Sequence, residues 1–143
     1  MARFDQAYWI EFTSDRFDHT SELPEDYNAG NRFYGRDLAV FLCDRLNEKG
    51  FDLVFGDEDW GWLVDGFSPD GTIVELCVYH YADEATPHVP DWALMFRTLE
   101  RRRVLVVTRN HEIEVPEPVL AALRGVLRDA GITPKRFELG NGR

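Results

Sequence analysis

The sequence has few cysteines, no long apolar run and no repeated or low-complexity tract. Its two cysteines, Cys43 and Cys77, each lie in an apolar stretch, and neither has neighbours at a metal-binding spacing. Free thiols in such places pack as small hydrophobic groups, and a reducing compartment is their simplest setting. No apolar stretch approaches the ~20 residues of a membrane span, and Met1 to Asp5 do not begin a secretion signal. We therefore expect a cytoplasmic protein that does not bind membranes.

The short motifs of common enzymes and metal sites are also missing from the sequence. There is no Gly-rich phosphate loop and no nucleophile elbow around a serine. His19, His80, His88 and His111 are scattered, and no pair has the helical spacing of zinc ligands. His80 is expected at a strand end, partly buried and hydrogen-bonded. We expect no cofactor and no metal and name no catalytic residue. Enzymatic activity stays open, with a non-catalytic function favoured.

Basic residues are scarce relative to acidic ones. Lys and Arg total 16 against 26 Asp and Glu, which gives a net charge of -10. A negative field repels phosphate backbones and speeds association with basic proteins, so we expect no ordinary nucleic-acid binding. Solubility alone is the simplest explanation of the charge. The one basic run, Arg101 to Arg103, is expected in a solvated turn, with pairing to acidic residues or an anion site as alternatives.

One globular domain over residues 1–143 is expected from the length and from the 44% of hydrophobic residues. The elements expected from periodicity and turn residues are a strand over 7–13, a loop over 14–31, a helix over 36–49, a hairpin over 59–67 and 72–81, an extended segment over 104–108, a helix over 117–130 and a strand over 133–139. The range 92–99 fits a strand or a helix, and the preceding hairpin favours the strand. This order predicts an α+β fold. Its mostly antiparallel sheet of roughly 4–6 strands carries two helices on one face, in a ferredoxin-like or related α/β sandwich.

The expected hairpin has a register that sorts its side chains onto two faces. The turn from Ser68 to Gly71 suits a three-residue loop with a bulge, which places Trp62 opposite Val78. One face then collects Trp60, Trp62, Val64, Val74, Leu76, Val78 and His80. The opposite face carries Asp59, Gly61, Leu63, Asp65, Glu75, Cys77, Tyr79 and Tyr81.

The segment from Asp57 to Trp62 is the most distinctive, with three acids followed by two indoles around Gly61. A glycine in this position lets a ligand or another backbone approach closely. Carboxylates beside aromatic rings suit a binding surface, and carboxylates can also perform acid–base catalysis or bind a cation. The simplest alternative places both indoles in the core. The candidate binding residues are Asp57, Glu58, Asp59, Trp60, Trp62, Glu75, Tyr79 and Tyr81.

Three parts of the chain resemble a group of small uncharacterised bacterial α/β proteins. They are the stretch from Gly35 to Leu38, the Glu-Asp-Trp-Gly-Trp motif that begins at Glu58, and Trp92. In that group a helix precedes the motif and a helix–strand pair closes the chain, whereas residues 101–115 depart from the pattern. The resemblance implies an α/β fold and no known activity.

The acidic loop and the net charge favour a non-catalytic acidic protein that binds a protein partner, as an inhibitor or toxin-immunity protein does. The candidate partner surface is Asp15, Asp18, Glu22, Glu25 and Asp26. Long loops of this kind are often functional, and the expected partner is basic. One alternative is a small-ligand or enzymatic site on the acidic-Trp motif. Another is a homo-oligomeric interaction domain, so a monomer and a homodimer are both open.

Overall fold

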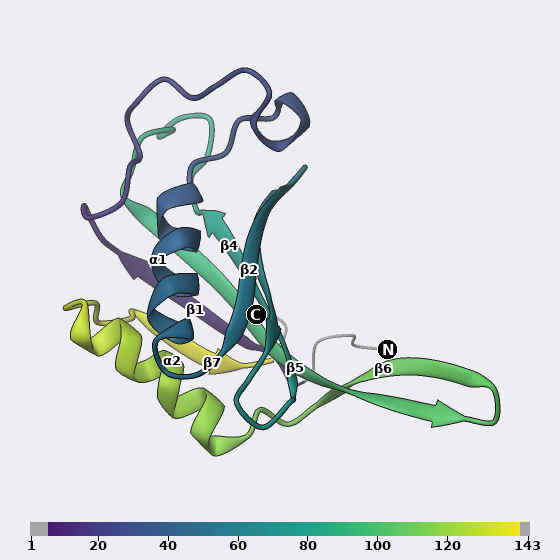
Figure 1. Ribbon diagram of the computed structural model, residues 1–143. Helices are drawn as coiled ribbons and strands as arrows, with labels where there is room; N and C mark the ends of the chain where they lie inside the picture. The colour runs from purple at the N-terminus through teal and green to yellow at the C-terminus, as the bar shows by residue number, and fades with distance from the viewer. Residues whose placement is uncertain (1–5, 141–143) are drawn as a thin grey trace.

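Within residues 6–140, seven β-strands form one antiparallel sheet, and two α-helices pack on one of its faces (Figure 1). The computed structural model describes residues 6–140. In chain order the elements are β1 (Tyr8–Thr13), the short 3₁₀ helix η1 (Tyr27–Gly30), α1 (Arg36–Asn47), β2 (Asp52–Glu58), β3 (Gly61–Phe67), β4 (Ile73–His80), β5 (Asp91–Val104), β6 (Val107–Ile113), α2 (Glu117–Asp129) and β7 (Arg136–Leu139). The predicted α+β class and both predicted helices are confirmed.

The strand order is β2-β3-β4-β5-β1-β7, with β6 paired to β5 alone. β1 lies between β5 and β7 and is antiparallel to both. α1 carries the chain from β1 to the edge strand β2, and α2 leads from β6 to β7 beside β1. This is a ferredoxin-like plan in which the meander from β2 to β5 replaces a single central hairpin.

The sheet has more strands than expected because the sequence pattern does not reveal β2 or β6. In β2 only Leu53 is buried, so this edge strand lacks a clear alternation of apolar and polar residues. β6 belongs to a projecting hairpin and its first four residues are exposed. Residues 104–108, expected as an extended segment, span the turn between β5 and β6. The favoured strand over 92–99 is confirmed within β5.

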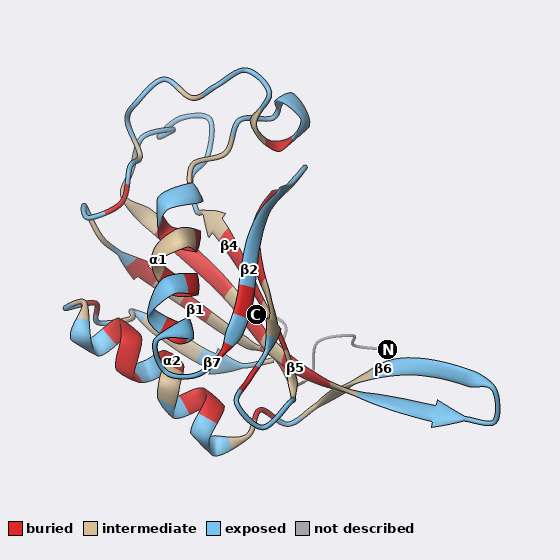
Figure 2. Cartoon of the chain, viewed as in Figure 1, coloured by how far each residue is buried: buried red, intermediate tan, exposed pale blue. Residues whose placement is uncertain are grey.

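The core lies between the two helices and the sheet face that they cover (Figure 2). α1 buries Leu38, Leu42 and Leu46, and α2 buries Leu123 and Leu127, at the spacing of one helical face. Opposite them, the sheet contributes Ile10, Phe12, Trp62, Val64, Val74, Leu76, Val78, Trp92, Leu94 and Phe96. The helix-facing side of the sheet is therefore sealed, and its other side is left for contact with solvent or a partner.

The hairpin of β3 and β4 has the predicted register. Trp62 lies opposite Val78, and the ladder continues in step to the turn. The backbone N–H of Ser68 donates to the carbonyl of Thr72 at 2.8 Å, which closes the predicted three-residue loop. The apolar side chains of this hairpin therefore face the helices, as the pattern of residues indicates.

The predicted position of Trp60 is wrong. β3 begins at Gly61, and Trp60 lies in the tight turn that joins β2 to β3. Because Trp60 precedes the strand, its side chain does not follow the alternation that holds Trp62 in the core. Instead of facing His80, its ring lies 5.3 Å from the ring of Tyr79, on the opposite side of the sheet.

We expect Gly61→Ala to lower the free energy of unfolding by about 1–2 kcal/mol, because any side chain at this position would clash with neighbouring backbone atoms. A Cβ at Gly61 would lie 2.7 Å from the carbonyl oxygen of Val78. Gly56→Ala is the matched control, since a Cβ there meets nothing within 4 Å. Urea denaturation of both variants measures the difference, and equal losses would contradict the close approach at Gly61.

The hairpin of β5 and β6 extends beyond the rest of the sheet as a two-stranded arm (Figure 1). Its ladder pairs residues 98–104 with residues 107–113. The basic run Arg101 to Arg103 therefore lies on a strand and not in a turn, which corrects the expectation. Arg102 pairs with Glu100 on the same strand at 2.5 Å.

Candidate functional site

Two acidic segments that are distant in the sequence meet at one end of the sheet, where β2 turns into β3. Asn28 in η1 joins them and is completely buried. Its backbone N–H donates to Oδ2 of Asp57 at 2.8 Å. Its Nδ2 donates to the carbonyls of Glu58 and Gly61 at 3.0 and 2.7 Å. The two segments form one surface, which we call the acidic end: residues 14–31 and 57–59.

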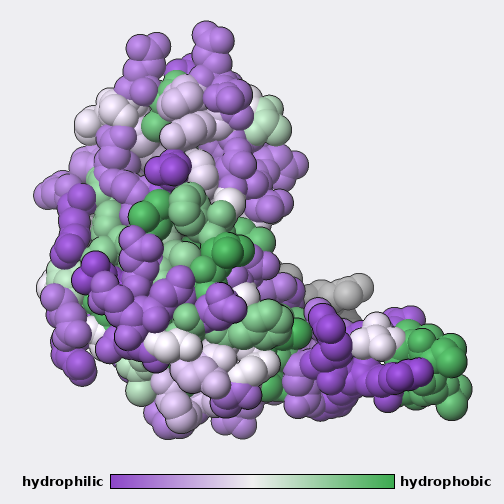
Figure 3. Space-filling view, viewed as in Figure 1, coloured by the Kyte–Doolittle hydropathy of each residue, from purple (hydrophilic) through white to green (hydrophobic). Residues whose placement is uncertain are grey.

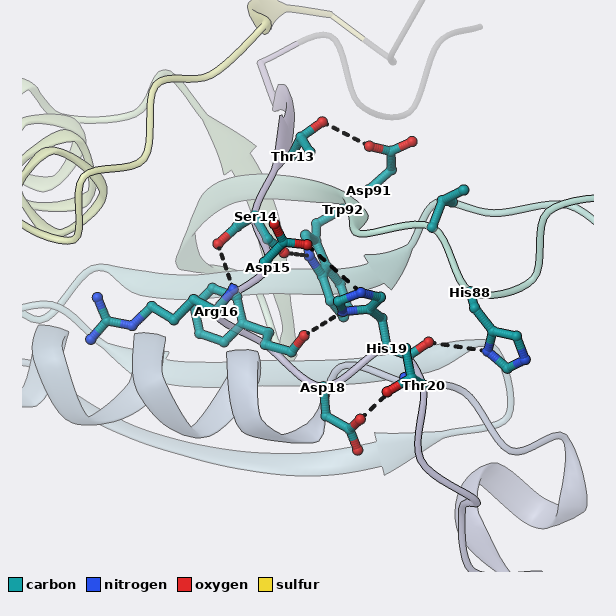
Figure 4. Close-up of polar contacts among 12 residues, drawn as sticks. Thr13, Ser14, Asp15, Arg16, Asp18, His19, Thr20, His88, Asp91 and Trp92 are labelled. Carbon is teal, nitrogen blue, oxygen red and sulfur yellow. Dashed lines mark hydrogen bonds and ion pairs between the residues drawn. The ribbon is translucent and has the colours of Figure 1, made fainter.

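The long acidic loop is tied to the body of the protein near its start (Figure 4). The indole N–H of the core residue Trp92 donates to the carbonyl of Ser14 at 3.1 Å. The backbone N–H of Asp18 donates to Oδ2 of Asp37 in the first turn of α1 at 2.8 Å. Hydrogen bonds from Ser21 are the largest cause of a lowered pKa at Asp18. The loop therefore presents its carboxylates from a backbone held by defined contacts.

Aromatic rings form a row on the sheet face opposite the helices. The ring centroids of Trp9 and Tyr79 lie 5.8 Å apart, and those of Trp9 and Tyr81 lie 6.4 Å apart. Trp60 adds a further ring next to Tyr79. Tyr81 is 54% exposed. Both α-helices of residues 6–140 pack on the other side of the sheet (Figure 1). We call the surface around Trp9, Trp60, Tyr79 and Tyr81 the open face.

Charged side chains surround the aromatic row on the open face. Burial, together with the charge of Glu75, raises the pKa of Asp65 above its usual range. Each arginine of this face lies between two carboxylates: Arg97 contacts Glu75 at 2.7 Å and Glu112 at 3.4 Å, and Arg136 contacts Glu11 at 3.0 Å and Glu138 at 2.8 Å. Because carboxylates outnumber guanidinium groups here, the face carries a negative charge.

Two polar groups of β4 on the open face have pKa values that burial raises. Burial raises the pKa of Cys77 to about 11. Burial and the neighbouring Cys77 raise the pKa of Tyr79 as well. A thiol with a raised pKa is a poor nucleophile, so the face suits binding better than nucleophilic chemistry. Cys43 is likewise buried with a raised pKa, and both thiols are free.

Three histidines that are scattered in the sequence gather at the acidic end, which their spacing does not predict. The ring of Tyr34 lies 5.2 Å from that of His80 and 6.1 Å from that of His88. Nδ1 of His88 lies 3.1 Å from the backbone oxygen of His19 (Figure 4). A hollow of about 890 Å³ is lined in part by Tyr34, His80 and His88. These residues come from two loops and the end of β4, so only the tertiary structure could reveal the group.

We expect His80 to make the protein less stable at acidic pH. Burial lowers the pKa of His80, and its Nε2 lies 2.6 Å from the carbonyl oxygen of Val89. A histidine whose pKa is lower in the folded state binds fewer protons there. Its contribution to stability is complete above the ordinary pKa of ~6.5 and is lost as the pH falls below it. His80→Gln should flatten the decline in unfolding free energy between pH 7 and pH 5, and an unchanged slope would contradict this.

The structure divides the predicted binding residues among three places. Trp62 is 3% exposed in the core, and its indole N–H donates to the carbonyl of Phe33 at 3.0 Å. Asp57, Glu58 and Asp59 belong to the acidic end, and the side chain of Glu58 lies on the side of the sheet that carries the aromatic row. The open face receives Trp60, Glu75, Tyr79 and Tyr81. Because the two indoles of the motif lie on opposite sides of the sheet, a single pocket lined by both is not formed.

Between residues 6 and 140, no group of three or more His, Cys, Asp or Glu side chains is placed to hold a metal ion. No helix in the same range is both long enough and apolar enough to span a bilayer.

The fold and the site define an acidic α+β protein with a partly exposed aromatic sheet face. Comparison of the chain with protein-family models, with curated proteins and with solved structures gives no match. The resemblance to small bacterial proteins through the Glu-Asp-Trp-Gly-Trp motif therefore stays a prediction.

Proposed function

We propose that the protein binds a basic protein partner through the acidic end and the adjoining open face, without catalysis of its own, as an inhibitor or toxin-immunity protein does. The position of Trp60 is the observation that carries this proposal. Trp60 directly follows the acidic residues 57–59 and places its ring against Tyr79. It therefore links the carboxylates of the acidic end to the aromatic row.

The two parts of this surface would contribute differently to binding. Exposed carboxylates steer a basic partner toward the surface and raise the association rate, most strongly at low salt. Tryptophan and tyrosine are over-represented among the residues that dominate binding energy, because they bury large areas and lose little conformational freedom. The acidic end supplies the first property and the open face supplies the second.

The test is affinity capture from a lysate of the source cells, identification of the bound protein, and calorimetry with the purified pair. We expect Trp60→Ala combined with Tyr81→Ala to raise Kd at least ~30-fold, the effect of losing about 2 kcal/mol at a dominant contact. We expect Glu25→Lys combined with Asp26→Lys to slow association at low salt and to weaken its salt dependence.

Matched variants on other surfaces serve as controls. Phe55→Ala removes a side chain that is 36% exposed on the helix side of β2, and Glu117→Lys changes an exposed acid at the start of α2. Both should bind like the wild type. A partner whose affinity is indifferent to salt and to Trp60 would overturn the proposal, as would failure to find any saturable protein partner.

A further inference from the structure

The arm formed by β5 and β6 ends in an exposed apolar tip. All residues from 101 to 110 are exposed. The exposed fractions at the tip are 66% for Val104, 88% for Leu105, 85% for Val106 and 46% for Val107. In Figure 3 these side chains form a hydrophobic cap on a hydrophilic stalk. Exposure of four consecutive aliphatic side chains to water is unfavourable, and burial of these side chains against a binding partner would be favourable.

The backbone of the tip also departs from the usual chemistry of a hairpin turn. Leu105 has a φ of 58°, a conformation for which tight hairpin turns select glycine, asparagine or aspartate. A bulky side chain in this region is strained, and such outliers cluster at functional positions. A two-stranded ribbon that leaves its sheet is also only marginally stable by itself in water. The residues of the tip therefore suit contact with an apolar surface better than they suit a tight hairpin turn.

The outer part of the arm, residues 101–110, is the basic part of an otherwise acidic protein. Residues 101–110 contain Arg101, Arg102, Arg103 and Arg109 and no acid. Since the whole chain has a net charge of -10, subtracting these four positive charges leaves -14 on the remainder. The arm thus matches a surface that combines apolar rings with carboxylates. The open face of the same protein, with Trp9, Trp60 and Tyr81 among carboxylates, is such a surface.

We propose that the arm of one copy docks on the open face of a second copy, and that the exchange is reciprocal and forms a two-fold dimer. Beyond the last pairing with β4 at Leu99, the free part of the arm extends over residues 100–104, or about 16 Å at ~3.3 Å per residue, which is close to the width of three strands at ~4.8 Å. The arm continues the central strand β5 past the end of its own sheet (Figure 1), so its tip lies beyond its own open face. In a reciprocal dimer one two-fold axis relates the two copies, and the arm of each copy is bound to the other.

An anionic membrane is a weaker match for the arm. The charge of -14 on the rest of the protein opposes approach to anionic lipid, and four arginines attract it by only about 1 kcal/mol each. The dimer rests on the proposed function because it uses the same face. It also adds a regulatory consequence: the arm of the second copy and the basic partner compete for the open face.

Sedimentation velocity on the full chain tests the dimer. We expect wild-type protein to dimerise at ~50 mM salt and to dimerise at least ~10-fold more weakly at ~500 mM, since ionic contacts are screened. Leu105→Asp combined with Val106→Asp should give a monomer with unchanged circular dichroism and Tm, because both side chains are almost fully exposed. Leu139→Asp, at a leucine that is 54% exposed outside the arm, should leave the dimer intact.

A mixing experiment identifies the docking surface. The tip variant (Leu105→Asp with Val106→Asp) and the face variant (Trp60→Ala with Tyr81→Ala) should each be monomeric alone. An equimolar mixture should form a heterodimer, because the intact arm of the face variant meets the intact face of the tip variant. A monomeric wild type, a dimer that survives in the tip variant, or a mixture that stays monomeric would overturn the proposal.

Two further measurements separate this inference from its alternatives. Tip-dependent binding of a monomeric wild type to vesicles of phosphatidylserine and phosphatidylcholine would assign the arm to membranes and overturn the dimer. The tip variant, which has an intact open face, is then tested against the basic partner captured as described above. If the tip variant binds the basic partner and the wild type does not dimerise, the proposed function holds and the dimer is wrong. If the wild type dimerises and no basic partner is found, the dimer holds and the proposed function is wrong.

Discussion

Replacing Asn28 with aspartate should lower the free energy of unfolding by about 3–5 kcal/mol, because it places a charge in a buried site built for an amide. Nδ2 of Asn28 donates to the carbonyls of Glu58 and Gly61, whereas Oδ1 accepts the N–H of Phe33 at 2.7 Å. A carboxylate keeps the contact with Phe33 but faces two carbonyl oxygens with no proton to donate. The nearby carboxylate of Asp57 adds repulsion.

Because of the backbone conformation at Asn28, the Asn28→Asp substitution tests the loss of the side-chain Nδ2 donor and not a change of backbone preference. Asn28 has a φ of 56°, a left-handed conformation that asparagine and aspartate both tolerate better than other side chains. Asn28→Asp therefore changes charge and hydrogen bonding with little change in shape or backbone preference. Asn28→Ala should cost about 2–4 kcal/mol, since it leaves two carbonyls and one N–H without their partner.

Asn31 provides the control for this prediction. Its Nδ2 donates to the carbonyl of Asp59 at 2.6 Å, but the residue is exposed, so water can replace the lost contact. Asn31→Asp should therefore cost less than about 1 kcal/mol. Chemical denaturation gives the free energies, and hydrogen exchange of the Trp62 amide reports on the β2–β3 turn. Similar losses for the two variants would contradict a special role of Asn28.

The elements that the sequence predicts correctly are those with strong periodic burial. α1 and α2 follow from leucines at helical spacing, and the register of β3 and β4 follows from the turn after Ser68. In each case a local pattern and the tertiary packing agree. β2 gives no such signal because it is an edge strand whose side chains mostly contact water. Its alternation is therefore weak, and the sequence pattern places no strand there.

The error at Trp60 has the same origin. Without β2, the motif that begins at Glu58 resembles the start of a strand, and the alternation then places both indoles on one face. With β2 in place, residues 58–61 form a turn and Trp60 is free to lie on Tyr79. The contact between the acidic loop and this turn depends on Asn28, a loop residue with no distinguishing sequence pattern. The acids of the site are thus visible in the sequence, but their convergence is not.

The second large effect is expected at Arg97, where Arg97→Met should lower the free energy of unfolding by about 2–4 kcal/mol at pH 7. Nε and Nη2 of Arg97 both lie 2.7 Å from Oε1 of Glu75, and the side chains are only 21% and 29% exposed. Removing one partner of a partly buried ion pair leaves the other charge without compensation. The carboxylates of Asp65 and Glu112 lie near the same position, so several negative charges would then face one another.

The pH dependence distinguishes this electrostatic cause from a simple loss of packing. Because the pKa of Asp65 is raised by burial and by the charge of Glu75, this carboxyl group takes up its proton sooner than an ordinary aspartate as the pH falls, which removes part of the repulsion. The loss caused by Arg97→Met should therefore be larger at pH 7 than at pH 4. Adding Glu75→Gln should recover part of the stability at pH 7, whereas Arg97→Lys should lose less than Arg97→Met because it keeps the charge. An equal loss at both pH values would mean that Arg97 acts through packing of its aliphatic chain, and that the carboxylates of the open face do not depend on it.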